Sequence, residues 1–280
     1  MVHNVQSLVS ENSKIKVDYY KEYTLENKVL LLNFTETWLN KDIKEDAEIE
    51  GYTSFRGDRQ ENITQGGTAI YVNDKVKDGK LIISFNSSKC EMVAVNMGTL
   101  NIINIVIYRP PHTKMCDFAP VLYELENILK NMGNPNPVVI MSGDFNFPFI
   151  EWVDSRIGYR CRPLYKPDIN ATLDEKSQFE RLMKICSEHN MFQVNNLPTR
   201  GKNVLDLLFT NDGDIFIDID VNKSGCSDHS VLEASTNFEM EQVISQQAEE
   251  VLESCNLRNL NFYHDSIDWD IVNRKIQVFP

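Results

Sequence analysis

The stretch from Val138 to Phe147 constrains the fold most, because it joins an apolar strand to a cluster of polar side chains. Its first four residues form a short apolar run, which is typical of a strand buried on both faces. The sequence then changes to Ser-Gly-Asp-Phe-Asn. Because alternate residues of an extended chain share a face, we expect the Asp144 and Asn146 side chains to point the same way. Together they suit a metal-bound phosphate or a proton transfer, although an Asp- and Asn-rich turn without chemistry has the same pattern.

Other expected strands also end in polar residues. The apolar run from Val29 to Phe34 leads into Glu36, so a second strand delivers a carboxylate at its end. Strands are also expected at residues 81–85, 91–96 and 100–108, and their close succession predicts antiparallel neighbours. The last of these ends at Tyr108 before two prolines, which stop a strand.

The last third of the domain adds an aspartate and a histidine. Asp206 is embedded in the apolar run from Val204 to Phe209, and a buried carboxylate needs a partner. His229 follows Asp228 just before the last expected strand, and a histidine beside carboxylates suits a general base held in one tautomer. Oxygen ligands without cysteine suit a hard cation such as Mg²⁺ or Mn²⁺. The candidate site groups are Asn4, Glu36, Tyr108, Asp144, Asn146, Asp206, Asp228 and His229.

Composition narrows the class of protein. The chain has 280 residues, of which 42% are hydrophobic and 25% charged, as in ordinary globular domains. Its six cysteines are scattered without a Cys-x-x-Cys pair, which favours reduced thiols in an intracellular protein over disulfides or a structural zinc site. We find no secretory signal, and the strongest apolar run is too short to cross a membrane.

The net charge of −13 disfavours a nucleic-acid partner at first, since such partners usually meet a basic face. The charge is uneven, however: residues 239–280 hold eight acidic and three basic residues. Part of the remaining excess would be neutralised by a bound cation. The irregular stretch from Pro148 to Thr172 is locally basic, with Arg156, Arg160 and Arg162, and reads either as a DNA-contacting loop or as a solvated one.

In this order, the motifs resemble the endonuclease/exonuclease/phosphatase family, which includes DNase I and the apurinic endonucleases. Within it, the chain is similar to the endonuclease domains of non-LTR retrotransposons of the jockey-like type. The resemblance implies a four-layer α/β sandwich, in which two mixed β-sheets pack face to face with helices outside. The motifs that carry it are Asn4-Val5-Gln6-Ser7-Leu8, Thr35-Glu36-Thr37-Trp38-Leu39, Gly66-Gly67, Tyr108-Arg109-Pro110-Pro111, Gly143-Asp144-Phe145-Asn146, Leu205-Asp206-Leu207 and Ser227-Asp228-His229.

The same resemblance implies a role for each matched residue. Glu36, with Asn4 and Asp228, would hold Mg²⁺ or Mn²⁺ against the scissile phosphate. Tyr108 and Asn146 would hydrogen-bond the phosphate oxygens. Asp144 would position or deprotonate the attacking water or serve the leaving oxygen, and His229, oriented by Asp206, would act as general base or stabilise charge on the phosphorane. The substrate-binding candidates are Arg109, Thr199 and Arg200.

The resemblance also divides the chain. Residues 1–238 correspond to the endonuclease domain, with a shortened N-terminal strand that we expect to weaken one sheet edge. Gln6 stands where apurinic endonucleases carry an acid, which predicts a less charged metal site. The acidic, partly helical residues 239–280 resemble the linker that precedes a reverse transcriptase.

The function expected from these features is metal-dependent hydrolysis of DNA phosphodiester bonds by a nuclear endonuclease of retrotransposon origin, which nicks target DNA for reverse transcription. The fold hosts other activities, so a phosphatase or phosphodiesterase acting on small phosphoesters is an alternative. A third hypothesis is a catalytically silent retroelement remnant that acts as a binding module. The intact residues Asp144, Asn146, Asp228 and His229 argue against this third hypothesis.

Overall fold

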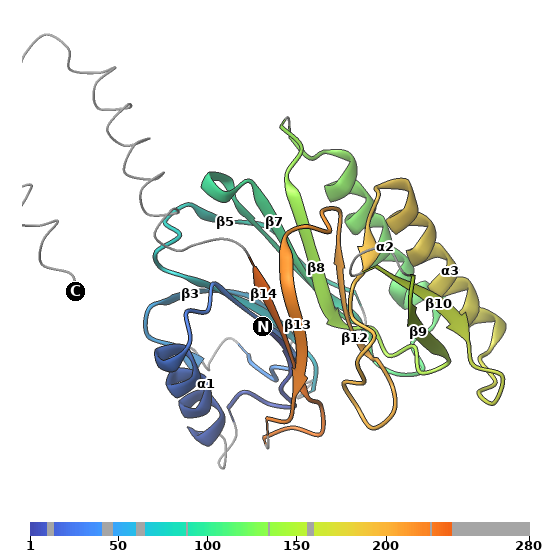
Figure 1. Ribbon diagram of the computed structural model, residues 1–280, viewed down its shortest axis with the longest axis horizontal. Coiled ribbons are helices and arrows are strands. Elements are labelled where there is room, and N and C mark those ends of the chain that lie inside the picture. Colours follow the sequence, from blue (N-terminus) through green and yellow to red (C-terminus); the bar gives the residue numbers. More distant parts are fainter. Residues whose placement is uncertain are drawn as a thin grey trace, which may run out of the picture.

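Two six-stranded β-sheets pack face to face in the computed structural model, which describes residues 1–9, 14–40, 47–59, 65–87, 89–133, 135–155, 160–224 and 226–236 (Figure 1). The first sheet has the order β13 (Phe216–Asn222), β14 (Val231–Thr236), β1 (Val2–Asn4), β2 (Leu31–Thr35), β4 (Thr68–Asn73) and β3 (Tyr52–Gly57). The second has the order β11 (Phe192–Gln193), β12 (Asp206–Thr210), β8 (Val138–Asp144), β7 (Ile102–Tyr108), β6 (Glu91–Met97) and β5 (Gly79–Asn86).

Helices cover the outer faces of both sheets. Helix α1 (Lys14–Glu26) lies against the first sheet, and α2 (Met115–Lys130) and α3 (Leu173–Glu188) lie against the second (Figure 1). One hydrophobic cluster fills the space between the sheets, and a separate cluster lies under the helices on each side. The predicted four-layer α/β sandwich is therefore confirmed. A short 3₁₀ helix, Gly98–Leu100, joins β6 to β7.

The central strands follow from their composition. Every residue of β2 and of β7 is buried, as expected for apolar runs covered on both faces. The interior also contains a polar bridge between the sheets: Asn33 and Asn104 each donate a hydrogen bond to the other's side-chain oxygen, at 3.1 and 2.8 Å. Asn33 also donates to the Ser142 hydroxyl at 2.9 Å. Because these buried amides are paired, they fix the register of one sheet on the other.

The strand directions bring the polar strand ends to one edge. Strands β1 and β2 are parallel, and β7 and β8 are parallel, with a helix in each crossover connection. Strand β12 runs antiparallel to β8 and pairs its first residue, Asp206, with the last residue of β8, Asp144. The consecutive strands β5, β6 and β7 are antiparallel neighbours, as predicted.

Two expectations are wrong. The short strand β1 lies between β14 and β2 inside the sheet, so it forms no sheet edge. The stretch from Pro148 to Thr172 is not irregular throughout, because β9 (Ile150–Asp154) and β10 (Cys161–Tyr165) form an antiparallel hairpin. Along β9, the buried Ile150 and Trp152 are separated by the exposed Glu151, which is the alternation of a strand. This alternation covers too few residues to be recognised in the sequence among the neighbouring basic residues.

Other sequence predictions concern segments that the structure describes only in part. Residues 239–280 and Arg156 lie outside the described residues. The five cysteines within the described ranges are all free thiols. No helix among the described residues has the length and apolar character needed to cross a membrane.

Candidate active site

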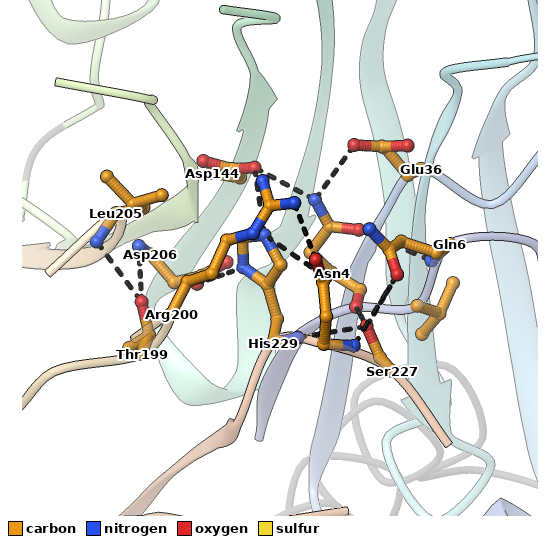
Figure 2. A network of polar contacts seen from close by, with 12 residues as sticks. Asn4, Gln6, Glu36, Asp144, Thr199, Arg200, Leu205, Asp206, Ser227 and His229 are labelled. Carbon is orange, nitrogen blue, oxygen red and sulfur yellow. Dashed lines mark hydrogen bonds and ion pairs between the residues drawn. The ribbon is translucent and has the colours of Figure 1, made fainter. Parts of the chain in front are cut away.

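The predicted site residues converge at one edge of the sandwich, where both sheets contribute side chains (Figure 2). Asn4 ends β1, and Glu36 follows β2 in the first sheet. Asp144 ends β8 and Asp206 begins β12 in the second sheet. His229 lies in the loop that leads into β14. Residues far apart in the chain therefore meet because the strands that carry them end at the same edge.

Gly143 lets the second sheet present Asp144. Its backbone has φ = +133°, and a Cβ at this position would overlap the Ile107 carbonyl group of the neighbouring strand. Beyond it, the Asn146 amide donates to Asp144 Oδ1 at 3.1 Å, and Asn146 has φ = +49°. This is a turn closed by an aspartate side chain, so the extended geometry expected for Asp144 to Asn146 is wrong. Asn146 Nδ2 donates instead to the Arg109 carbonyl oxygen at 3.1 Å.

Asp206 and His229 form a buried pair across the two sheets. His229 Nδ1 lies 2.7 Å from Asp206 Oδ2, and both side chains are buried. Burial lowers the pKa of His229, but the Asp206 charge and hydrogen bond, together with the Asp144 charge, outweigh it and raise this pKa to about 9. His229 Nε2 and Asp206 Oδ1 are buried and have no hydrogen-bond partner among the described residues.

The opposite ring nitrogen faces two more carboxylates. His229 Nε2 is 3.9 Å from Asp144 Oδ2 and 3.9 Å from Asp228 Oδ1. Asp144 is fully buried, and burial raises its pKa well above the ordinary range, with a further rise from the Asp206 charge. His229 therefore lies among carboxylates to which it can transfer a proton, or whose negative charge its protonated ring can stabilise.

Asn4 connects Glu36 to Asp144. Its side-chain nitrogen donates to Glu36 Oε1 at 3.1 Å and to Asp144 Oδ2 at 2.8 Å. Its side-chain oxygen accepts the Gln6 backbone amide at 3.3 Å, and the second lone pair of that oxygen can still bind a metal ion. Trp38 Nε1 donates to the other Glu36 oxygen at 3.3 Å. Burial raises the pKa of Tyr108, with smaller contributions from the charges of Glu36 and Asp144, so the Tyr108 phenol remains a hydrogen-bond donor.

Two neighbouring sets of residues could hold a metal ion. Ligand atoms of Asp144, Asp206 and His229 lie within 4.8 Å of one another, which makes these residues a possible metal site. The set expected from the resemblance, Glu36, Asn4 and Asp228, lies beside it. The carboxylate oxygens of both sets, and the amide oxygen of the second set, fit a hard divalent cation. The unpartnered Asp206 and His229 atoms show unused coordination capacity in the first set.

The structure corrects two of the substrate-binding candidates. Arg109 is only 1% exposed, and it donates to Gln178 Oε1 and to the carbonyl oxygens of Phe145 and Asn146, so it is turned inward. Thr199 is equally buried, and its hydroxyl accepts the backbone amides of Leu205 and Asp206 at 3.1 and 3.0 Å. Both residues hold site residues in place rather than facing a substrate.

The third candidate, Arg200, does face the surface. Its side chain is 43% exposed and pairs with Asp228 Oδ2 at 2.5 Å. The Asp228 side chain is 47% exposed, so a ligand at this edge can reach both groups. If Asp228 binds a metal ion, it must therefore either release Arg200 or bind the ion through the oxygen that Arg200 does not contact.

Some residues at the site were not assigned a role from the sequence. Ser227 donates to the Asn4 carbonyl oxygen at 2.7 Å and accepts the His229 amide at 3.2 Å, which ties the Ser-Asp-His loop to β1. In the sequence, its place in the Ser-Asp-His motif was the feature that could have indicated this role. Gln178, on α3, accepts from Arg109 Nε at 2.8 Å, and nothing in its helical sequence context distinguishes it from a core residue.

Comparisons with known proteins identify the fold. Residues 102–233 match the family model described as endonuclease-reverse transcriptase. No curated protein sequence matches the chain. The solved endonuclease domain of TRAS1, a telomere-specific non-LTR retrotransposon, is 15% identical, with a TM-score of 0.55 over 85% of this chain and 97% of its own.

Two other solved structures align equally fully. The 3′ phosphatase NExo from Neisseria, bound to a product DNA hairpin, is 14% identical, with a TM-score of 0.59 over 85% of this chain and 98% of its own. An AP endonuclease from Archaeoglobus fulgidus is 13% identical, with a TM-score of 0.55 over the same shares of the two chains. At these identities the likeness establishes the fold.

This chain has the endonuclease/exonuclease/phosphatase fold. The resemblance to that family is confirmed by the family model, whose matched range contains Tyr108, Asp144, Asn146, Asp206 and His229. In this DNase I-like sandwich the candidate site lies at the edge where polar strand ends of both sheets meet.

Proposed function

We propose that the chain is a divalent-metal-dependent DNA endonuclease that hydrolyses phosphodiester bonds. The observation that carries this proposal is the convergence of the buried Asp206–His229 pair, Asp144 and the Glu36–Asn4 pair at one edge of the sandwich. Phosphodiester hydrolysis needs charge stabilisation on phosphate oxygens and a proton at the leaving oxygen. The groups at this edge can supply both.

In this proposal Glu36, Asn4 and Asp228 hold Mg²⁺ or Mn²⁺. A bound cation supplies a Lewis acid that withdraws charge from a phosphate oxygen. Glu36 supplies a half-buried carboxylate, and Asn4 supplies an amide oxygen whose orientation is fixed by the two hydrogen bonds that its nitrogen donates. Asp228 supplies an exposed carboxylate, from which Arg200 can move to a phosphate.

The chain's own residues handle the proton. Because Asp206 binds Nδ1, the second ring nitrogen of His229 faces the centre of the site. The raised pKa of His229, about 9, keeps a proton on the ring near neutral pH in the ion-free site, so Nε2 can donate that proton to the leaving oxygen of the phosphodiester. Asp144, whose pKa burial raises, can accept a proton from the attacking water. Tyr108 and Asn146 orient the phosphate.

A retroelement context is part of the proposal. The family model carries a reverse transcriptase in its description, and the TRAS1 domain comes from a non-LTR retrotransposon. We therefore propose that the chain nicks target DNA for reverse transcription, with a reverse transcriptase in the parent polypeptide and a nuclear site of action.

A second candidate is removal of phosphate from DNA ends. It is favoured by the similarity to NExo, which is described as a 3′ phosphatase and has a TM-score of 0.59. Both reactions use the same phosphate-oxygen chemistry, so the substrate decides between them.

One experiment separates these functions. The full chain is incubated with supercoiled plasmid and, separately, with an oligonucleotide bearing a 3′ phosphate, each with Mg²⁺, with Mn²⁺ or with excess chelator. We expect plasmid nicking only in the presence of a divalent ion. Phosphate release without nicking would favour the phosphatase. DNA binding without either reaction, under all ion conditions, would leave only a binding module.

A further inference from the structure

The Gly66-Gly67 motif is the one sequence motif that has no part in the site as described so far. Its two residues have φ = +99° and +89°, values that glycine adopts without cost. Their carbonyl oxygens accept the backbone amides of Trp38 at 2.8 Å and of Thr37 at 3.3 Å. The glycine pair therefore holds the turn that immediately follows Glu36.

That turn is strained and needs support. Glu36 has φ = +52° and Trp38 has φ = +54°, in the left-handed region that residues with a side chain rarely adopt. Such a conformation persists only where its surroundings determine it. On one side the Glu36 and Thr37 carbonyls accept backbone amides from the segment after β1, at 2.8 Å each. On the other side the glycine pair is the support.

A buried ion pair lies behind the glycines. Arg59, just after β3, donates from Nε to Glu91 Oε1, and from its terminal nitrogen to the Lys89 carbonyl. Glu91 begins β6 and is only 1% exposed, and the Arg59 side chain is 14% exposed. A Cβ on Gly66 would overlap the Arg59 guanidinium, so this contact explains the glycine.

Glu91 also reaches toward the site. It pairs with Tyr108 across β6 and β7, and its surroundings include the Gly67 backbone amide and the charge of Glu36. Burial raises the pKa of Glu91 to about 7, whereas the Arg59 hydrogen bond and charge oppose that rise. Arg59 thus favours the charged form of a buried carboxylate directly behind the Glu36 turn, against the effect of burial.

We propose that Arg59 and Glu91 are positioning residues that fix Glu36 for metal binding, by holding Gly66-Gly67 against the Glu36 turn. This inference rests on the proposed metal-dependent function. Neither side chain touches the substrate or the ion. Groups one shell away from a metal ligand typically change metal affinity by about 10–100-fold when they are removed.

Two alternative explanations predict different results. If Arg59 acted only through its charge, its neutral variant would bind a cation more tightly, because a positive charge near the site is lost. If it acted only on global stability, the folded fraction would fall while the affinity of each folded molecule stayed the same. A positioning role alone predicts weaker binding by the folded protein.

The experiment is direct Mn²⁺ binding by the full chain, measured by electron paramagnetic resonance as free against bound ion, with thermal unfolding recorded in parallel. The variants are Arg59→Gln, Glu91→Gln and the control Lys130→Gln. Lys130 forms an ion pair with Glu126 at 2.5 Å on α2, on the far side of the second sheet, so the control removes the same charge elsewhere. We expect Arg59→Gln and Glu91→Gln each to raise the Mn²⁺ Kd roughly tenfold, and Lys130→Gln to leave it unchanged.

The outcomes distinguish the two proposals. If the parent binds Mn²⁺ and Arg59→Gln binds it equally or more tightly, the positioning role is overturned and the proposed function stands. If the parent binds no Mn²⁺ and nicks without it, the metal-dependent function falls, and this inference with it. Should the ion-pair variants fail to unfold cooperatively, Gly67→Ala decides, because its Cβ would lie 2.6 Å from Thr37 Oγ1 and displace the same turn. A parent-like Kd in Gly67→Ala would then overturn the inference.

Discussion

The two sheets contribute to the site in different ways. The second sheet supplies Asp144 and Asp206, both fully buried and both within reach of His229. The first sheet and its loops supply Glu36, which is half-buried on a strained turn, and Asp228, whose side chain is 47% exposed. One half of the site is therefore enclosed in protein, and the other half is open to solvent.

The supports of the two halves differ as well. On the second sheet, Arg109 links the Asp144–Asn146 turn to Gln178 on α3, and Thr199 fixes the start of β12. On the first sheet, Glu36 depends on backbone hydrogen bonds to two neighbouring loops. Side chains from a helix and a loop therefore hold the enclosed half. The open half is held by backbone hydrogen bonds between the Glu36 turn and the loops on either side of it.

This difference suggests a division of labour. Buried carboxylates around an imidazole have shifted pKa values and suit proton transfer. Accessible oxygen ligands suit a cation that must enter from water and shed part of its hydration shell. We infer that the first sheet holds the ion and the second sheet moves the proton, with His229 joining them.

The largest effect is expected from loss of the ion. Excess chelator should abolish plasmid nicking, and Glu36→Ala should abolish it at Mg²⁺ concentrations that saturate the parent, because a ligand of the open half is lost. Nicking is measured as conversion of supercoiled to open-circular plasmid, with Glu126→Ala on α2 as the control for removal of an acidic side chain. Undiminished nicking in chelator would show that no ion is needed.

The next effect concerns the enclosed half. His229→Ala and Asp206→Ala should each lower the nicking rate by about 10²–10⁴-fold, the usual range for general acid–base catalysis. Because the two residues act as a pair at 2.7 Å, the double variant should be little worse than the poorer single variant. Single-turnover rates at saturating ion give the comparison. Rate losses that multiply would mean independent roles, with Asp206 a structural carboxylate.

A smaller effect is expected behind the Asp144–Asn146 turn. Gln178→Leu removes the acceptor of Arg109 Nε and should loosen the turn, which lowers kcat by roughly 10–100-fold, since small misplacements of catalytic groups are costly. KM should stay near its parent value, because Arg109 does not face the substrate. Lys184→Gln, on the exposed side of the same helix, is the control. A change in KM alone would return Arg109 to the substrate-binding residues.

The smallest effect is expected from the β9–β10 hairpin, which lies outside both halves. Arg160 and Arg162 are exposed there, and the hairpin contacts the loop that carries Arg200 through the Asn196–Asp154 hydrogen bond at 2.7 Å. If both arginines bind DNA phosphates, their alanine variant should flatten the log–log salt dependence of DNA binding by roughly one unit each. An unchanged slope would make the hairpin a solvated element.

The sequence predicted the enclosed half better than the open half. Apolar runs that end in Asp144 or contain Asp206 fix both the strand and the burial of the carboxylate, so the sandwich and the Asp206–His229 pair could be expected. The inward orientation of Arg109 and Thr199 could not, because a motif gives position along the chain but not side-chain direction. Long-range partners such as Gln178 and Glu91 depend on packing between elements, which no local pattern encodes.

The division between the sheets is tested most directly by Mn²⁺ binding to Glu36→Ala and Asp206→Asn, each compared with the parent by electron paramagnetic resonance. We predict that Glu36→Ala loses binding at ion concentrations that saturate the parent. Asp206→Asn should keep an affinity close to the parent's although it nicks far more slowly. The reverse result, in which Asp206→Asn loses the ion and Glu36→Ala retains it, would place the metal among Asp144, Asp206 and His229 and would contradict the division of labour.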